Sequence, residues 1–241
     1  MANKTQRHPR RPRIGIDLDH EHDGRRWVFK IPTRYVDVVM KAGGEPVLVA
    51  PGDGRQPDEA LDGLDGFLMT GGDDVHPRAF GRTPDGMKMR LLSHRRETFV
   101  LGLAAAILAR KLPTLGVCLG CQALNLAAGG RLWIDLYSEH EAPGEHRNGN
   151  QHAIHPEPDG MLFRYWQGEP QTLKSHHHQA VRSVAGDCRV EAHAADGVIE
   201  AWSAPLHPFL LAVQWHPEIQ PDTPGGLPLV RALVDAAQAA H

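Results

Sequence analysis

The sequence predicts an α/β fold in which helices cover both faces of a largely parallel sheet. In the first half of the chain, short apolar runs alternate with longer helix-like runs, the pattern of successive strand–helix units. In the second half, β-like runs follow one another closely, and such runs usually pair in antiparallel fashion. A length of 241 residues, 41% of them hydrophobic, suits one such domain with a sizeable core.

The predicted elements can be placed in order along the chain. Strands are expected over four short apolar runs, at 13–18, 46–50, 66–69 and 112–117. Helices are expected over four longer runs, at 31–42, 93–111, 119–128 and 227–240. Ser93 provides an N-cap for the second helix, and pairs of glycines end the first and the third.

The C-terminal half adds a second strand region, with β-like runs at 179–184, 189–194, 198–202 and 209–213. We therefore predict a flavodoxin-like three-layer α/β sandwich with a largely parallel central sheet, helices on both faces and additional antiparallel strands. Residues 1–12 are expected to form a flexible basic tail, and residues 13–241 a single domain. Residues 137–160 are polar and rich in histidine, glycine and proline, and they are predicted to form a long, functional loop.

The segment Gly116-Val117-Cys118-Leu119-Gly120 lies between a predicted strand and a predicted helix. A strand–turn–helix of this kind presents a nucleophile at the top of an α/β sheet, and its glycines allow backbone segments to approach closely. A cysteine in this position lies at a helix N-terminus, which favours the nucleophilic thiolate. Taken alone, the segment fits equally well a buried cysteine on an ordinary turn.

A second motif, Gln214-Trp215-His216-Pro217-Glu218, directly follows an apolar run that ends at Val213. A nucleophilic cysteine needs a base, and the base needs an orienting group. A strand ending at Val213 carries His216 to the sheet edge, and Pro217 allows Glu218 to fold back towards the imidazole. The His-x-Glu spacing is common by itself. Together with the elbow cysteine, it predicts a catalytic triad of Cys118, His216 and Glu218.

Acyl transfer also needs N–H groups that stabilise the developing oxyanion. One donor is expected from Leu119, the residue after the nucleophile. The other is expected from Gly71 or Gly72, in the glycine loop that follows the predicted strand 66–69. By itself, that loop also fits an ordinary strand–helix turn.

These motifs and several others lie in an order that is typical of one family. Beside the Cys118 elbow and the 214–218 motif, the matching segments are 70–77, 96–99, 125–132 and 175–181. The chain resembles the class I glutamine amidotransferases. It is more similar still to their stand-alone γ-glutamyl hydrolases of the peptidase C26 type, typified by γ-glutamyl-γ-aminobutyrate hydrolase. The resemblance covers the chain from about residue 14 to the C-terminus.

The resemblance implies a cysteine-dependent hydrolysis of a γ-glutamyl amide, such as γ-glutamyl-γ-aminobutyrate or a γ-glutamyl-polyamine. Glutamate and an amine would be released through a thioester intermediate. The resemblance also implies five substrate-binding residues: Gln122, Ser175, His177, His178 and Gln179. The chain departs from the family pattern at two positions, because Leu119 often is arginine in the family and Cys121 usually is methionine or leucine.

Two other functions remain open. The chain could be a glutaminase subunit that delivers ammonia to a separate synthase, or a redox sensor that uses Cys118 and Cys121. The second is disfavoured because no member of the predicted triad is lost. The amine leaving group is not fixed by the sequence. A cationic amine would suit four acidic residues near the predicted loops: Asp73, Asp74, Glu139 and Glu141.

Composition argues against several other kinds of protein and partner. A net charge of −3 disfavours a nucleic-acid-binding protein, and no stretch approaches the ~18 apolar residues of a membrane span. The basic N-terminal segment lacks the apolar region of a signal peptide. Three cysteines do not suggest a disulfide framework, so a cytoplasmic location is expected. The expected partner is a small-molecule substrate, with a homodimer as the default assembly.

Sixteen histidines raise the question of a metal site. The candidates are His140, His146, His152 and His155 and the run His176-His177-His178. Their spacings match no zinc signature, and the cysteines do not complete one. Neighbouring histidines in an extended chain also point to opposite sides. The sequence therefore predicts neither a metal nor another cofactor.

Overall fold

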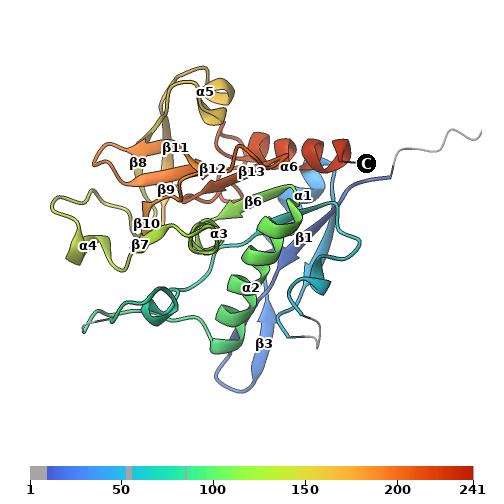
Figure 1. The fold of residues 1–241 in the computed structure, drawn as a ribbon, viewed down its shortest axis with the longest axis horizontal. Coiled ribbons are helices and arrows are strands. Elements are labelled where there is room, and N and C mark those ends of the chain that lie inside the picture. The colour runs from blue at the N-terminus through green and yellow to red at the C-terminus, as the bar shows by residue number, and fades with distance from the viewer. Residues whose placement is uncertain (1–9, 53–55, 85, 241) are drawn as a thin grey trace, which may run out of the picture.

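The computed structural model describes residues 10–52, 56–84 and 86–240 (Figure 1). Within these residues, eleven strands form one mixed sheet, and a separate hairpin pairs β2 (Asp19–His22) with β3 (Trp27–Lys30). Most of the predicted tail, residues 1–9, lies outside the described residues. The domain boundary at residue 13 stays a prediction.

Five parallel strands form one half of the sheet, in the order β4 (Glu45–Val49), β1 (Arg13–Asp17), β5 (Gly66–Met69), β6 (Thr114–Val117) and β13 (Leu210–Val213). The three strands β5, β6 and β13 are buried along their whole length. Because the strands are parallel, their carboxyl ends meet at one edge, where Val117 is paired with Val213. This half matches the predicted parallel region.

The sheet continues beyond β13 in antiparallel fashion through β12 (Ile199–Ser203), β11 (Arg189–Ala194), β8 (Asn150–Pro156) and β9 (Gln171–Ser175). A side branch is formed by β10 (Ala180–Ser183), which pairs with both β12 and β7 (Arg131–Trp133). The predicted fold class, a parallel core extended by antiparallel strands, is therefore confirmed.

Helices cover the parallel half on both faces (Figure 1). On one face α1 (Thr33–Ala42) packs against α6 (Leu227–Ala239), and on the other α2 (His94–Arg110) packs against α3 (Leu119–Ala128). The alternation of side chains along β5 serves both cores, since Leu68 faces α1 and α6 while Phe67 and Met69 face α2 and α3. The predicted cap at Ser93 is present, with its Oγ accepting from Arg96 N–H.

The predicted loop at 137–160 was wrong in part. It contains the end of α4 (Leu136–Glu139) and the whole of β8, which lies inside the sheet between β11 and β9. Only Ile154 of β8 is fully buried, so the strand has no apolar alternation to reveal it. Backbone pairing with a neighbour on each side defines this strand. The short helix α5 (Met161–Trp166) follows it, and 3₁₀ turns occur at Glu59–Leu61 and Pro77–Phe80.

None of the helices in the described residues combines the length and the apolar character that crossing a bilayer requires.

Candidate active site

Cys118 occupies a strained turn between β6 and α3, with φ 49° and ψ −101°. A non-glycine residue in such a conformation costs about 1–3 kcal/mol and is common at functional sites. The flanking glycines allow the close packing that holds the turn. A methyl group at Gly120 would lie 2.6 Å from Met69 Cβ, and one at Gly116 would lie 2.7 Å from Leu124 Cδ1.

The neighbouring strand β13 brings the predicted base to this turn. The Cys118 N–H donates to the Val213 carbonyl at 2.8 Å, and the chain continues from Val213 to His216. His216 Nδ1 lies 2.8 Å from Glu218 Oε1, so the carboxylate does fold back onto the imidazole. The structure thus brings Cys118, His216 and Glu218 together, whereas their catalytic roles stay a prediction.

The electrostatics of His216 suit a reactive cysteine. Burial lowers the pKa of His216, but hydrogen bonds with the Cys118 and Glu218 side chains outweigh it and raise this pKa to about 10. His216 is therefore protonated at neutral pH. An imidazolium beside Cys118 stabilises negative charge on the sulfur, the arrangement that makes a cysteine nucleophilic.

Tyr35 is a member of this site that sequence reasoning missed. Its buried hydroxyl accepts a hydrogen bond from Gly71 N–H at 3.0 Å and lies 3.5 Å from His216 Nδ1. Burial, and then the charge of Glu218, raise the pKa of Tyr35 well above its usual value, so the hydroxyl keeps its proton. In the sequence, Tyr35 looks like an apolar-face residue of an amphipathic helix, and no local motif marks it.

The glycine loop after β5 lies directly against the elbow. A methyl group at Gly71 would be 2.7 Å from His216 Cε1, and one at Gly72 would be 2.6 Å from Leu119 Cδ2. The Gly71 N–H already donates a hydrogen bond to Tyr35. Of the two glycines, Gly72 is therefore the better candidate for the oxyanion donor. The oxyanion roles of Leu119, Gly71 and Gly72 stay predictions.

A network of buried polar side chains contacts the start of this glycine loop. Arg96 and Asp17, both fully buried, form an ion pair, and Arg96 also donates to Thr70 Oγ1 at 3.0 Å. Asp17 accepts from Thr70 N–H at 2.8 Å, while the Thr70 carbonyl accepts from Gly120 N–H at 3.1 Å. The network fixes the start of the glycine loop relative to both β1 and the elbow.

Four of the five predicted substrate-binding residues make buried hydrogen bonds to protein groups. Ser175 Oγ donates to the His146 carbonyl, His177 Nδ1 to the Gln179 carbonyl, and Gln122 Nε2 to the same carbonyl. The Gln179 amide pairs with both backbone groups of Val75. These bonds anchor the segment 175–179 to α3 and to the loop after β5. Substrate contact by these residues stays a prediction.

The other two histidines of this segment face outward. His178 Nε2 lies 2.8 Å from Asp74 Oδ1, and this hydrogen bond raises the pKa of His178 despite its partial burial. His176, which was not among the predicted site residues, is exposed and its ring centroid lies 5.8 Å from that of His216. The alternation of an extended chain was the signal that could have placed it beside His178.

A pocket of about 290 Å³ opens next to this site and is lined by Tyr35, Gly71 and His216 among others. Its charged residues include Lys30 and Arg90, which both pair with Glu21. Arg34 is exposed in the same pocket and has no ion-pair partner within the described part of the chain. A free guanidinium here can receive the carboxylate of a substrate.

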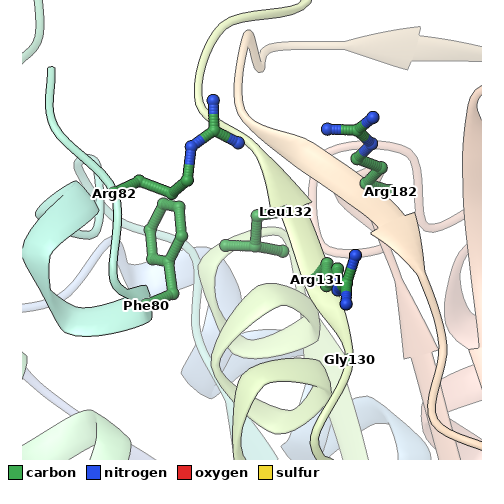
Figure 2. Close-up of a pocket in the computed structure, with 6 residues that line it drawn as sticks. All are labelled: Phe80, Arg82, Gly130, Arg131, Leu132 and Arg182. Carbon is green, nitrogen blue, oxygen red and sulfur yellow. The ribbon is translucent and has the colours of Figure 1, made fainter. Parts of the chain in front are cut away.

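A second pocket, of about 280 Å³, lies beside β7 and β10 (Figure 2). Figure 2 shows three arginines around it, Arg82, Arg131 and Arg182. Arg82 pairs with Glu139 at 2.5 Å and Arg182 stacks on Trp133. No member of the predicted triad lines this pocket, whereas His216 and Glu218 line the first one.

The Peptidase C26 family matches residues 14–218 of the chain. The chain belongs to this family. Membership makes the protein a glutamine amidotransferase-type amidohydrolase, which confirms the predicted resemblance.

Individual relatives agree with this assignment. "Putative glutamine amidotransferase Rv2859c" of Mycobacterium tuberculosis is 37% identical over 213 residues, covering 86% of this chain and 67% of the relative. "Gamma-glutamyl-gamma-aminobutyrate hydrolase" of Escherichia coli O157:H7 is 31% identical over 204 residues, covering 77% of each chain. A solved structure from Thermoplasma acidophilum, a "putative gmp synthase subunit a protein", has a TM-score of 0.68 at 17% identity and 97% coverage of both chains. The last match shows the fold alone.

Proposed function

We propose that the protein hydrolyses a γ-glutamyl amide to glutamate and an amine, through a thioester on Cys118. The observation that carries the proposal is the elbow cysteine beside a His216–Glu218 pair, with Nδ1 and Oε1 2.8 Å apart, in a C26 fold. The similarity to a γ-glutamyl-γ-aminobutyrate hydrolase supports a γ-glutamyl substrate.

The reaction begins with the Cys118 thiolate, which attacks the γ-carbonyl carbon of a substrate bound above the strand ends. The N–H of Leu119 stabilises the oxyanion together with a glycine N–H of the loop after β5, that of Gly72 as long as the Gly71 N–H stays bound to Tyr35. The protonated His216 then gives its proton to the departing amine, leaving the glutamyl group as a thioester on Cys118. Neutral His216 next takes a proton from water, which hydrolyses the thioester, and Glu218 holds the imidazole in place throughout.

The pocket favours an α-carboxylate more clearly than a cationic leaving group. Arg34 offers a positive charge at the pocket that no acidic side chain of the described residues pairs with. Three of the four acidic residues that suggested a cationic amine have partners, since Asp73 pairs with Arg90 at 3.1 Å, Asp74 with His178 and Glu139 with Arg82. These contacts offset their negative charges, which weakens the case for a cationic leaving group such as a polyamine.

One observation favours a second function, that of a glutaminase subunit working with a separate synthase. The Gly71 N–H donates to Tyr35 Oη at 3.0 Å and is not free to hold an oxyanion. A subunit whose oxyanion site is completed only by a partner would show little activity by itself.

Glutamate release by the purified chain alone distinguishes the two functions. The substrates are γ-glutamyl-γ-aminobutyrate, γ-glutamyl-polyamines, a γ-glutamyl anilide and glutamine. Cys118→Ala is the inactive variant, and Cys188→Ala is its matched control, because Cys188 lies outside the pocket. Cys118-dependent release from one γ-glutamyl amide, far above that from glutamine, supports the hydrolase. Slow turnover of glutamine alone supports the subunit, and activity retained in Cys118→Ala contradicts both.

A further inference from the structure

Three histidine side chains converge on one buried carboxylate, well apart from the triad in the sequence. Glu200 on β12 has a side chain only 1% exposed. Its Oε1 lies 3.1 Å from His146 Nδ1, 3.3 Å from His152 Nε2 and 3.5 Å from His177 Nε2. The four residues come from four separate segments of the chain. None belongs to the predicted triad, and only His177 is among the residues that the family resemblance implies for substrate binding.

The neighbours of two of these rings determine which nitrogen carries the proton. His146 Nε2 lies 2.8 Å from Asp196 Oδ2, and His177 Nδ1 lies 3.1 Å from the Gln179 carbonyl oxygen. A carboxylate and a carbonyl only accept hydrogen bonds, so each takes the N–H of its ring. The opposite nitrogens, His146 Nδ1 and His177 Nε2, then direct lone pairs towards Glu200.

This arrangement leaves a set of buried acceptors facing one another. Six atoms at this place have no hydrogen-bond partner among the described residues: His146 Nδ1, His152 Nδ1, His152 Nε2, His177 Nε2, Glu200 Oε1 and Glu200 Oε2. His146 Nδ1 and Glu200 Oε1 are 3.1 Å apart, and Nδ1 has no N–H to join them when Nε2 carries the only proton of the ring. Buried polar atoms almost always have hydrogen-bond partners. A cluster of buried acceptor atoms without such partners is therefore explained by a cation bound between them.

The spacing of these atoms fits a small tetrahedral ion. With bonds of about 2.0–2.1 Å, the ligands of a four-coordinate zinc lie about 3.3 Å from one another. The separations of 3.1 Å and 3.3 Å from Glu200 Oε1 to His146 and His152 lie around that value. Ligand atoms of His146, His152 and Glu200 are all within 4.8 Å of one another. Asp196 is placed as the outer carboxylate that orients a zinc-binding histidine.

An ion also has a route to this place. A pocket of about 300 Å³, lined by Pro143, Gly144, His146, His152 and Asp196 among others, opens onto the cluster. The His152 side chain is 16% exposed, while that of His146 is 1% exposed. The ligands can therefore be reached from solvent without unfolding of the sheet.

We propose that this cluster is a zinc site, with His146, His152 and Glu200 as its three protein ligands and a water molecule in the fourth position. Two imidazole nitrogens and a carboxylate oxygen are donors that suit Zn²⁺. The ion would join the segment before β8, β8 itself and β12, and the segment 175–179 would pack against it through His177, whose Nε2 lies 3.5 Å from Glu200 Oε1. That last segment presents His176 to the catalytic His216, so the ion would hold one wall of the active site. The site revises the expectation of no metal, because its ligands are too far apart in sequence to form a spacing motif.

The test uses the full chain with Cys118→Ala, which removes the catalytic thiolate as a competing ligand. After dialysis against a chelator, the protein is titrated with Zn²⁺ against a chromogenic competitor, and bound metal is measured by mass spectrometry. We expect one Zn²⁺ per chain and a higher Tm than that of the metal-free protein. A folded chain that binds no Zn²⁺ stoichiometrically overturns the proposal and indicates instead a protonated His146 between two carboxylates.

Three substitutions in the same background locate the site. His152→Ala and Glu200→Gln should each lose the bound Zn²⁺, while His155→Ala, an exposed histidine of the same strand, should keep it. Retention of the metal in both ligand variants overturns the proposal. If these variants do not fold, the visible absorption spectrum of the Cys118→Ala protein loaded with Co²⁺ tests the site. Strong visible absorption of a four-coordinate ion without thiolate charge-transfer bands supports the site, and weak six-coordinate absorption overturns it.

Discussion

The two halves of the sheet build their polar sites in different ways. In the parallel half, β5, β6 and β13 are wholly buried, and the predicted catalytic residues follow within a few positions of the carboxyl ends of β6 and β13. In the antiparallel half, β8 and β9 are largely polar, and the residues that meet at Glu200 come from distant segments. In the parallel half, the predicted catalytic residues therefore lie at strand ends. In the antiparallel half, the proposed metal ligands come together from neighbouring strands and loops.

Removing the nucleophile should have the largest effect. In Cys118→Ala, glutamate release should fall by roughly 10⁴-fold or more, because the thioester cannot form. The Tm should change little, since a methyl group still fits the strained turn. Cys188→Ala, measured in parallel, should retain nearly full activity. Comparable losses in both variants would mean that the chemistry is not located at the end of β6.

The difference between the halves also explains what the sequence could predict. Cys118 and the His216–Glu218 pair lie in short contiguous motifs next to apolar strands, so their proximity could be anticipated. Tyr35 could not, because its hydroxyl reaches Gly71 only once α1 packs beside the strand ends. The strand β8 and the Glu200 cluster were also out of reach, since polar strands lack an apolar pattern and tertiary pairing alone joins their residues.

The close packing around the elbow, the turn at Cys118 between β6 and α3, allows a second test of the parallel half, with a slightly smaller expected effect on activity. A methyl group in Gly120→Ala would meet Met69 Cβ and the Met69 carbonyl oxygen, both at 2.6 Å. Such overpacking should destabilise the protein by about 1–3 kcal/mol and lower activity by roughly 10²–10³-fold, because α3 carries Leu119 away from the oxyanion. Gly186→Ala is the matched control, because nothing lies within 4 Å of its new methyl group. Equal Tm values for the two variants would show that the elbow is loosely packed.

Replacing the acid of the triad should affect both rate and pH dependence. In Glu218→Gln we expect kcat to fall by roughly 10²-fold, less than for a serine triad, because a cysteine is intrinsically more nucleophilic and depends less on activation by the acid. The hydrogen bond to Glu218 helps to raise the pKa of His216 to about 10. Loss of the negative charge lowers that pKa, so the alkaline limb of kcat/KM should move to lower pH. An unchanged alkaline limb would contradict the coupling of Glu218 to His216.

Tyr35→Phe tests whether the hydroxyl supports the triad or blocks the oxyanion site. We expect kcat to fall about tenfold, with KM nearly constant, since one hydrogen bond to a charged group contributes about 1.5 kcal/mol. The phenyl ring keeps the packing of α1, so the Tm should hold. A rise in kcat would instead show that Tyr35 occupies the Gly71 N–H that the oxyanion needs, which favours the glutaminase subunit.

We expect the smallest effect from replacing His176, the residue of the antiparallel half that lies beside His216. His176 is exposed, and its ring centroid lies 5.8 Å from that of His216. Partial desolvation by the neighbouring side chains, followed by the positive charge of His216, lowers the pKa of His176, so this ring is neutral and is not needed as an acid. His176→Ala should therefore raise KM about threefold and leave kcat unchanged, as expected when only ground-state contact is lost.

His155→Ala on β8 serves as the control for His176→Ala, because it removes an exposed histidine from the same half of the sheet. A KM effect confined to His176 would limit the antiparallel half to shaping the substrate-binding wall, with the chemistry left to the parallel strands. A tenfold fall in kcat in His176→Ala would contradict this division, because both halves of the sheet would then contribute a catalytic group.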